Sequence, residues 1–156
     1  MTRRLLISAL LISVGVAPAL EAQARQATPP PAAAQAATGN VAVAVTYTGK
    51  GVVDATHQIL VLLFSTPQVG PTSKPLMPPQ FIQKNGGTAT FTGVTVSPVY
   101  VAAVFNEKGD YHGQGGPPPS GSPYTLHADA KGAMLPVKAN AGASVMLLFD
   151  GSKRRP

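Results

Sequence analysis

Residues 41–46 read Val41-Ala42-Val43-Ala44-Val45-Thr46, an alternation of larger and smaller side chains. Successive side chains of a β-strand point to opposite faces, so this period of two predicts a strand with one strongly apolar face. Residues 58–64 (Gln-Ile-Leu-Val-Leu-Leu-Phe) form a continuous apolar run, which is typical of a central strand buried on both sides. The two patterns together indicate a β-domain.

Further short strands are expected at residues 81–84, 88–94, 99–105, 124–127, 133–138 and 143–149. Asn85-Gly86-Gly87 lies between the first two and Asn140-Ala141-Gly142 between the last two, and we interpret both as hairpin turns. No stretch of ten or more residues after Gly39 keeps a helical period without Gly or Pro. The expected fold is therefore all-β, a single antiparallel β-sandwich of about seven strands.

Two long segments interrupt the strand pattern. Residues 65–79 contain five prolines and cannot form a central strand, because proline has no backbone N–H to donate. Residues 106–123 are rich in glycine and include three consecutive prolines. Loops longer than about 12–15 residues are often functional in compact domains, so we expect these two loops to carry any binding site.

The first 24 residues have the pattern of a cleaved export signal. Arg3 and Arg4 precede an apolar run at 5–16, and Ala22-Gln23-Ala24 supplies small residues for a signal peptidase. The run is shorter than the roughly 20 residues that span a bilayer. The expected organisation is a signal peptide at 1–24, a Pro/Ala-rich linker at 25–39, a β-sandwich domain at 40–150 and a basic tail at 151–156.

Composition excludes several classes of protein. The 156 residues include no cysteine, so disulfides, thiolate metal sites and a cysteine nucleophile are excluded. Without the signal, ten basic and five acidic side chains give a net charge of +5, and only Lys153-Arg154-Arg155 forms a cluster. A nucleic-acid reader would show a concentrated basic face. We expect no nucleic-acid partner, no membrane segment after cleavage, a frayed tail, and a periplasmic or secreted bacterial location.

Part of the chain has the order of elements of a known group. Thr90-Phe91-Thr92-Gly93-Val94 and then Val99-Tyr100-Val101 follow the apolar strand at 59–64. Over residues 41–105 this resembles the carboxypeptidase-regulatory, transthyretin-like (prealbumin-like) small β-sandwiches, although Pro98 stands where glycine is usual. The resemblance implies an Ig-like or transthyretin-like accessory or binding domain of an exported bacterial protein, without catalytic residues.

The start of the second loop contains the candidate metal ligands. Asn106, Glu107, Asp110 and His112 lie around Gly109, and oxygen ligands spaced around a glycine are how short loops bind Ca²⁺. Lys108 occupies a ligand position, however, and no later glutamate follows. A polar turn with Gly109 at positive φ is the alternative interpretation. No sequence motif for Zn²⁺ is present. We expect no cofactor, with Ca²⁺ at this loop as the possible exception.

Tyr111, Gln114 and Tyr124 are the candidate ligand-binding residues of the same loop. The two tyrosines flank its glycine–proline stretch and offer flat faces to a sugar ring or a proline-rich peptide. The alternative is that they pack within a structured spacer loop. The sequence has no nucleophile elbow, zinc-protease motif or phosphate-binding loop, so an enzyme is not expected.

These patterns predict an exported, non-enzymatic accessory or binding module that uses the loops at 65–79 and 106–123. Its expected partner is a ligand, or a protein, peptide or glycan of the cell envelope. One alternative is a metal-binding (Ca²⁺ or Zn²⁺) or hydrolytic protein centred on residues 106–112. The other is a purely structural envelope spacer that associates through edge strands.

Overall fold

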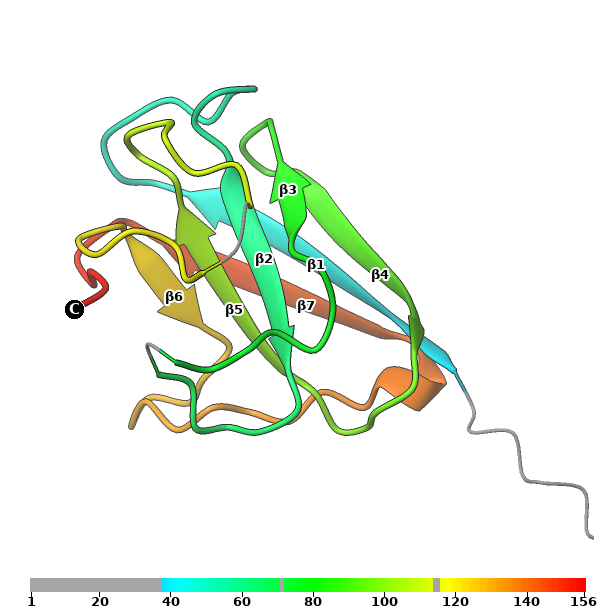
Figure 1. The fold of residues 1–156 in the computed structure, drawn as a ribbon. Helices are drawn as coiled ribbons and strands as arrows, with labels where there is room; N and C mark the ends of the chain where they lie inside the picture. The colour runs from blue at the N-terminus through cyan, green and yellow to red at the C-terminus, as the bar shows by residue number, and fades with distance from the viewer. Residues whose placement is uncertain (1–37, 71, 114–115) are drawn as a thin grey trace, which may run out of the picture. The chain divides into compact units, whose positions relative to one another are not determined.

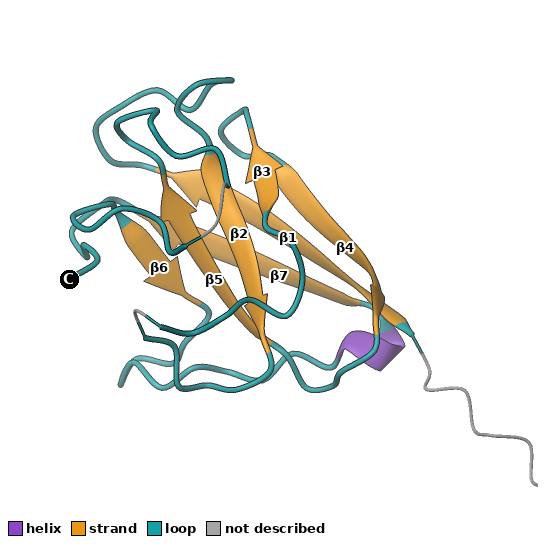
Figure 2. Ribbon diagram, viewed as in Figure 1, coloured by secondary structure: helices purple, strands orange, loops and turns teal. Residues whose placement is uncertain are grey.

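The computed structural model describes residues 38–70, 72–113 and 116–156. Within these residues the chain is all-β, as expected, with seven strands and one short 3-10 turn (Figure 1, Figure 2). The elements are β1 (Gly39–Tyr47), β2 (Ile59–Phe64), β3 (Gln80–Ile82), β4 (Thr88–Val94), β5 (Tyr100–Phe105), β6 (Tyr124–Leu126), η1 (Ala139–Ala141) and β7 (Ala143–Phe149). The predicted signal peptide and all but the last two residues of the predicted linker lie outside the described residues.

The strands form two sheets, ordered β4-β1-β7 and β3-β2-β5-β6. All strand pairs are antiparallel except β1 with β7, which are parallel with Val41 opposite Ala143. The expectation of a purely antiparallel arrangement is therefore wrong at this pair. No helix in the described part of the chain is long and apolar enough to cross a membrane.

A shared apolar core lies between the two sheets. Val41, Val43 and Val45 of β1 are fully buried, which confirms that the alternation at 41–46 gives a strand with one apolar face. Facing them, β2 contributes Ile59, Val61 and Leu63 to the same core. Burying one such side chain stabilises the fold by about 1.5–3 kcal/mol. All six residues of β2 are buried, so the expectation of a strand covered on both faces is also confirmed.

The turn at Asn85 connects the two sheets and does not form a hairpin. Strand β3 pairs with β2, whereas β4 pairs with β1. The reason lies in the turn's hydrogen bonds: the Asn85 side chain accepts from the Tyr47 N–H at 2.8 Å and donates to the Tyr47 carbonyl at 2.7 Å. The Gly86 N–H donates to the Val45 carbonyl at 3.1 Å. These bonds attach the turn to the end of β1, so β4 continues along β1.

The second predicted hairpin is also wrong. Residues 133–138 form only two isolated bridges, Ala128 with Met134 and Val99 with Val137. Pro136 lies inside this stretch and cannot donate to a ladder. The chain then makes the 3-10 turn η1 and enters the other sheet, where β7 runs parallel to β1.

The C-terminal tail is paired with another segment, so the expectation of a frayed end is wrong. The Arg155 N–H donates to the Ser122 carbonyl at 3.0 Å, and the Gly121 N–H donates to the Arg155 carbonyl at 2.9 Å. The Tyr124 N–H donates to the Lys153 carbonyl at 3.0 Å. The tail therefore lies along residues 121–124, up to the first residue of β6.

Candidate ligand pocket

The outer face of the sheet β3-β2-β5-β6 is apolar. Leu62 and Phe64 of β2 and Ala102 and Val104 of β5 form a second buried cluster, separate from the core. Tyr100, Tyr124, Leu126 and Val69 pack against it and are partly buried. Because β2 and β5 are apolar at nearly every position, exposing either face of this sheet to water would be unfavourable.

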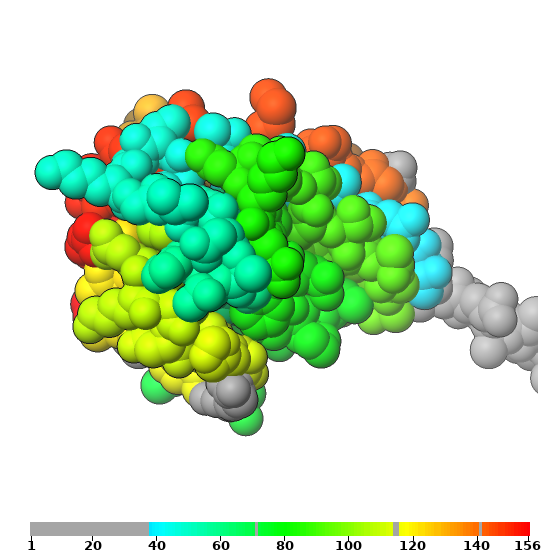
Figure 3. All heavy atoms as spheres, turned by 90° about the horizontal axis from the view of Figure 1, so that it is seen from above, coloured from blue at the N-terminus to red at the C-terminus, as the bar shows by residue number. Residues whose placement is uncertain are grey.

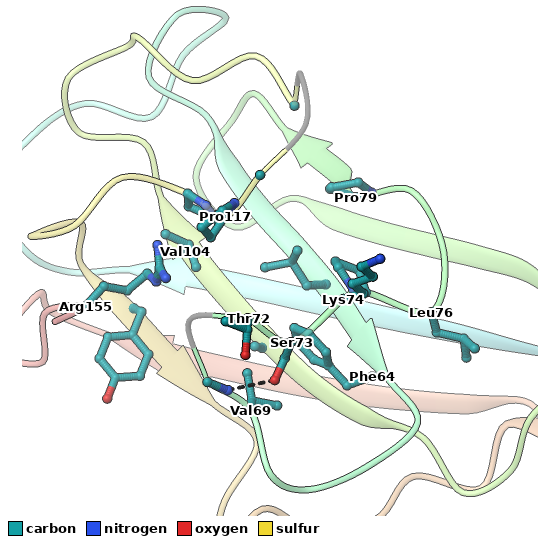
Figure 4. A pocket seen from close by; sticks show the side chains of 18 of the residues that line it. Phe64, Val69, Thr72, Ser73, Lys74, Leu76, Pro79, Val104, Pro117 and Arg155 are labelled. Carbon is teal, nitrogen blue, oxygen red and sulfur yellow. Dashed lines mark hydrogen bonds between the residues drawn. The ribbon is translucent and has the colours of Figure 1, made fainter.

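Two long loops and the tail enclose a cavity of about 830 Å³ over this face (Figure 4). Cavities of roughly 300–1,000 Å³ are the usual size for small-molecule sites. The loop at 65–79 forms one side, the loop at 106–123 another, and Arg155 and Pro156 complete the lining. These are the two loops that sequence length and composition single out.

Six prolines line the cavity: Pro75, Pro78, Pro79, Pro117, Pro118 and Pro156. Proline has no backbone N–H, so these walls present few hydrogen-bond donors to a ligand. The first loop is fixed by the Leu76 N–H, which donates to the Leu63 carbonyl at 2.7 Å. The Ser73 hydroxyl oxygen accepts from the Gly70 N–H at 2.8 Å, the bond drawn in Figure 4. The walls are therefore mainly apolar, and the first loop is held in place by one bond to β2 and one within the loop.

Tyr111 and Tyr124, selected from the sequence, both line this cavity. The Tyr111 hydroxyl donates to the Gly116 carbonyl at 3.0 Å. Burial raises the pKa of Tyr111, and the positive charge of Arg155 acts in the opposite direction. Tyr111 is thus a neutral wall residue with its hydroxyl already bonded. The third candidate, Gln114, lies outside the described residues.

Two of the four candidate metal ligands, Asn106 and Glu107, have other partners in the structure. The Asn106 side chain is buried and bonds to Tyr111, donating to its carbonyl at 2.9 Å and accepting from its N–H at 3.3 Å. Glu107 pairs with Arg154, with Oε2 and the guanidinium nitrogen 2.5 Å apart. Asp110 and His112 are exposed. Among the described residues, no three His, Asp or Glu side chains form a group that could hold a metal ion.

Gly109 has φ +70°, as the interpretation of a polar turn expects. A Cβ at this position would lie 2.7 Å from the Thr56 methyl carbon. Figure 3 views the end of the molecule where the β1–β2 connection lies beside this turn. In that connection Asp54 accepts from the N–H groups of His57 and Thr56, at 2.7 and 2.8 Å. These bonds lower the Asp54 pKa, so this carboxylate and the imidazole beside it stabilise their own turn.

Sequence reasoning missed the floor of the cavity and the contribution of the tail. The continuous apolar runs at 58–64 and 99–105 carried the relevant signal, since two strands apolar on both faces imply a second apolar surface. No sequence pattern predicts that Arg155 lines the cavity, because its position depends on the pairing of the tail with residues 121–122.

The fold and the cavity define an all-β protein of two sheets with a partly open, mainly apolar pocket on the outer face of one sheet. Comparison with known protein families, curated proteins and solved structures finds no match to this chain.

Proposed function

We propose that this chain is an exported, non-enzymatic binding module that holds an apolar ligand between its two long loops. The supporting observation is the cavity of about 830 Å³ whose floor is an apolar sheet face. Export rests on the signal pattern at 1–24. The sandwich type, Ig-like or transthyretin-like, rests on the resemblance over residues 41–105, and both stay predictions.

The chemistry of the lining supports binding through apolar contact. The lining contains the hydroxyls of Thr72, Ser73, Tyr111 and Tyr124, and those of Ser73 and Tyr111 are bonded to loop backbone. Leu62, Phe64 and Val104 have no polar atoms in their side chains, and they form the floor. Because the floor residues are only 4–6% exposed, the apolar surface that a hydrocarbon would remove from water lies mainly on partly buried lining residues such as Val69 and Leu126. Such surface contributes roughly 25 cal/mol per Å².

A variant with a larger side chain on the floor of the cavity tests the proposal. Ala102 lies opposite Leu62 on one side and Leu126 on the other, so its side chain points into the cavity with theirs. Ala102→Phe places an aromatic ring in this space. We expect the purified protein to bind the uncharged dye Nile red with increased fluorescence, and Ala102→Phe to weaken that binding on the order of tenfold or more.

Ala42→Phe is the matched control. Ala42 occupies the central strand of the other sheet, between Thr90 and Ser144, on the face away from the core. It receives the same added ring far from the cavity lining, so we expect dye binding to be unchanged. Equal loss in both variants, or dye binding that Ala102→Phe leaves intact, would refute the pocket as the binding site.

A further inference from the structure

The charged side chains that line the cavity are cationic. Lys74 and Arg155 belong to the lining, and no described lining residue is Asp or Glu. In the described part of the chain the ion pairs are His57 with Asp54 and Arg154 with Glu107. Neither Lys74 nor Arg155 therefore pairs with a described Asp or Glu side chain. The side chains at the edge of the apolar cavity carry positive charge that no described Asp or Glu neutralises by an ion pair.

Arg155 is held in position at this edge by its backbone. Its N–H and its carbonyl bond to Ser122 and Gly121 respectively, and the side chain is partly buried. Lys74 approaches from the other loop, at 65–79, and is exposed. Figure 4 shows both side chains around the pocket, with Arg155 near Pro117. The charge of Arg155 also reaches Tyr111 in the lining, since it acts to lower the pKa of that phenol.

We infer that the ligand of this pocket is a single-chain amphiphile with a carboxylate head group, which is the chemistry of a fatty acid. The inference rests on the proposed function and specifies its ligand class. The hydrocarbon chain covers Leu62, Phe64 and Val104, and the carboxylate is bound at Arg155. A planar guanidinium offers two parallel N–H donors to a carboxylate. Lys74 adds a second positive charge that attracts the same head group.

Three probes with the same twelve-carbon chain test the head group: dodecanoate, dodecanol and dodecyltrimethylammonium. Each competes with Nile red at concentrations below micelle formation. We expect dodecanoate to bind about tenfold more tightly than dodecanol, because it adds a charge-assisted hydrogen bond. The cationic probe should bind most weakly, since it meets two like charges.

Charge-neutralising variants locate the effect. Arg155→Gln, and Arg155→Gln combined with Lys74→Gln, should reduce dodecanoate affinity to that of dodecanol and leave dodecanol affinity unchanged. The backbone bonds that hold the tail are retained in both. Lys131→Gln is the control, because Lys131 is exposed in the turn after Asp129 and outside the lining; it should leave all three affinities unchanged.

The outcomes separate this inference from the proposed function. Equal affinity for dodecanoate and dodecanol, or a dodecanoate preference that survives both Gln variants, would overturn the carboxylate assignment. If Ala102→Phe still abolishes Nile red binding, the apolar binding function stands in that case. If neither Nile red nor any alkyl probe binds the unmodified protein below micelle formation, both proposals are wrong.

Discussion

At the scale of single residues, Asn106 explains how the second loop leaves the sheet. It follows β5 directly and is 2% exposed, so its amide must be bonded within the protein. Both bonds go to the backbone of Tyr111, five residues later. The Gly109 N–H also donates to the Asn106 carbonyl at 3.2 Å. This side chain therefore closes the turn at 106–111 and places Tyr111 at the cavity.

We predict that Asn106→Ala lowers the free energy of unfolding by about 1–3 kcal/mol, because it leaves two partly buried backbone groups without partners. Urea unfolding monitored by circular dichroism measures this. Asn140→Ala is the matched control: Asn140 is exposed and bonds only weakly, with its oxygen 3.4 Å from the Ser97 hydroxyl. It should cost less than about 0.5 kcal/mol. Equal costs would contradict the assigned role of Asn106.

At the scale of elements, the C-terminal tail connects the second loop to β6. Its backbone bonds to residues 121–124, and Arg154 bonds to both Glu107 and the Gly121 carbonyl. The Ser120 hydroxyl donates to the Pro156 carbonyl. The tail thus joins both ends of the loop, and through Arg155 it contributes to the cavity lining.

The pairing of Glu107 with Arg154 predicts a pH dependence. The hydrogen bond from Arg154 lowers the Glu107 pKa below its usual 4.5. A carboxyl with a lowered folded-state pKa stabilises the fold above its unfolded-state pKa, and this contribution is lost as the pH falls through the folded-state value. The pair is exposed, so its effect should be small.

We therefore expect Glu107→Gln to unfold at a slightly lower temperature than the unmodified protein at pH 6. The difference should shrink as the pH falls below the usual carboxyl pKa of 4.5 and disappear below the lowered folded-state pKa. Thermal unfolding across this pH range tests it. Asp110→Asn removes a carboxylate from the same loop outside any described ion pair and should show no such pH-dependent difference. A Glu107→Gln difference that persists or grows at acid pH would contradict the pairing.

The strands themselves were predictable from sequence, but their partners were not. Alternation at 41–46 and the continuous runs at 58–64 and 99–105 determine burial locally, and β1, β2 and β5 occur there. In the turn at Asn85, Gly86 has φ +77°, the conformation that glycine permits. That local conformation does not determine which strand β4 pairs with. The choice of β1 follows from bonds between Asn85 and Tyr47, 38 residues apart, which no local pattern reveals.

The candidate site divides in the same way. Loop length and proline content identify the two loops, and the flanking positions identify Tyr111 and Tyr124, all of which border the cavity. The polarity of the turn at 106–112 predicts metal ligands, but the structure gives Asn106 and Glu107 other partners. The sequence does not show which face of β2 packs in the core and which faces the pocket. All six residues of β2 are apolar, so no alternation of polar and apolar side chains distinguishes the two faces.

At the scale of the whole molecule, the sheet β3-β2-β5-β6 has two apolar faces, and different parts of the chain pack on each. The inner face of β3-β2-β5-β6 packs on the three-stranded sheet, and the outer face is covered by the loops and the tail around a cavity. The other sheet has a different outer surface, where Met146 and Leu148 of β7 are 84% and 69% exposed. These two residues are the main alternative apolar site for a ligand on the described surface.

Methyl NMR during a titration with dodecanoate tests the central claim most directly, because it reports where the ligand lies. We predict that the methyl signals of Leu62, Val104 and Leu126 shift progressively, whereas those of Met146 and Leu148 stay in place. Val43, deep in the core, serves as an internal reference. Shifts concentrated at Met146 and Leu148, with the pocket methyls unchanged, would show that the ligand binds the exposed face of β7 and would contradict this account.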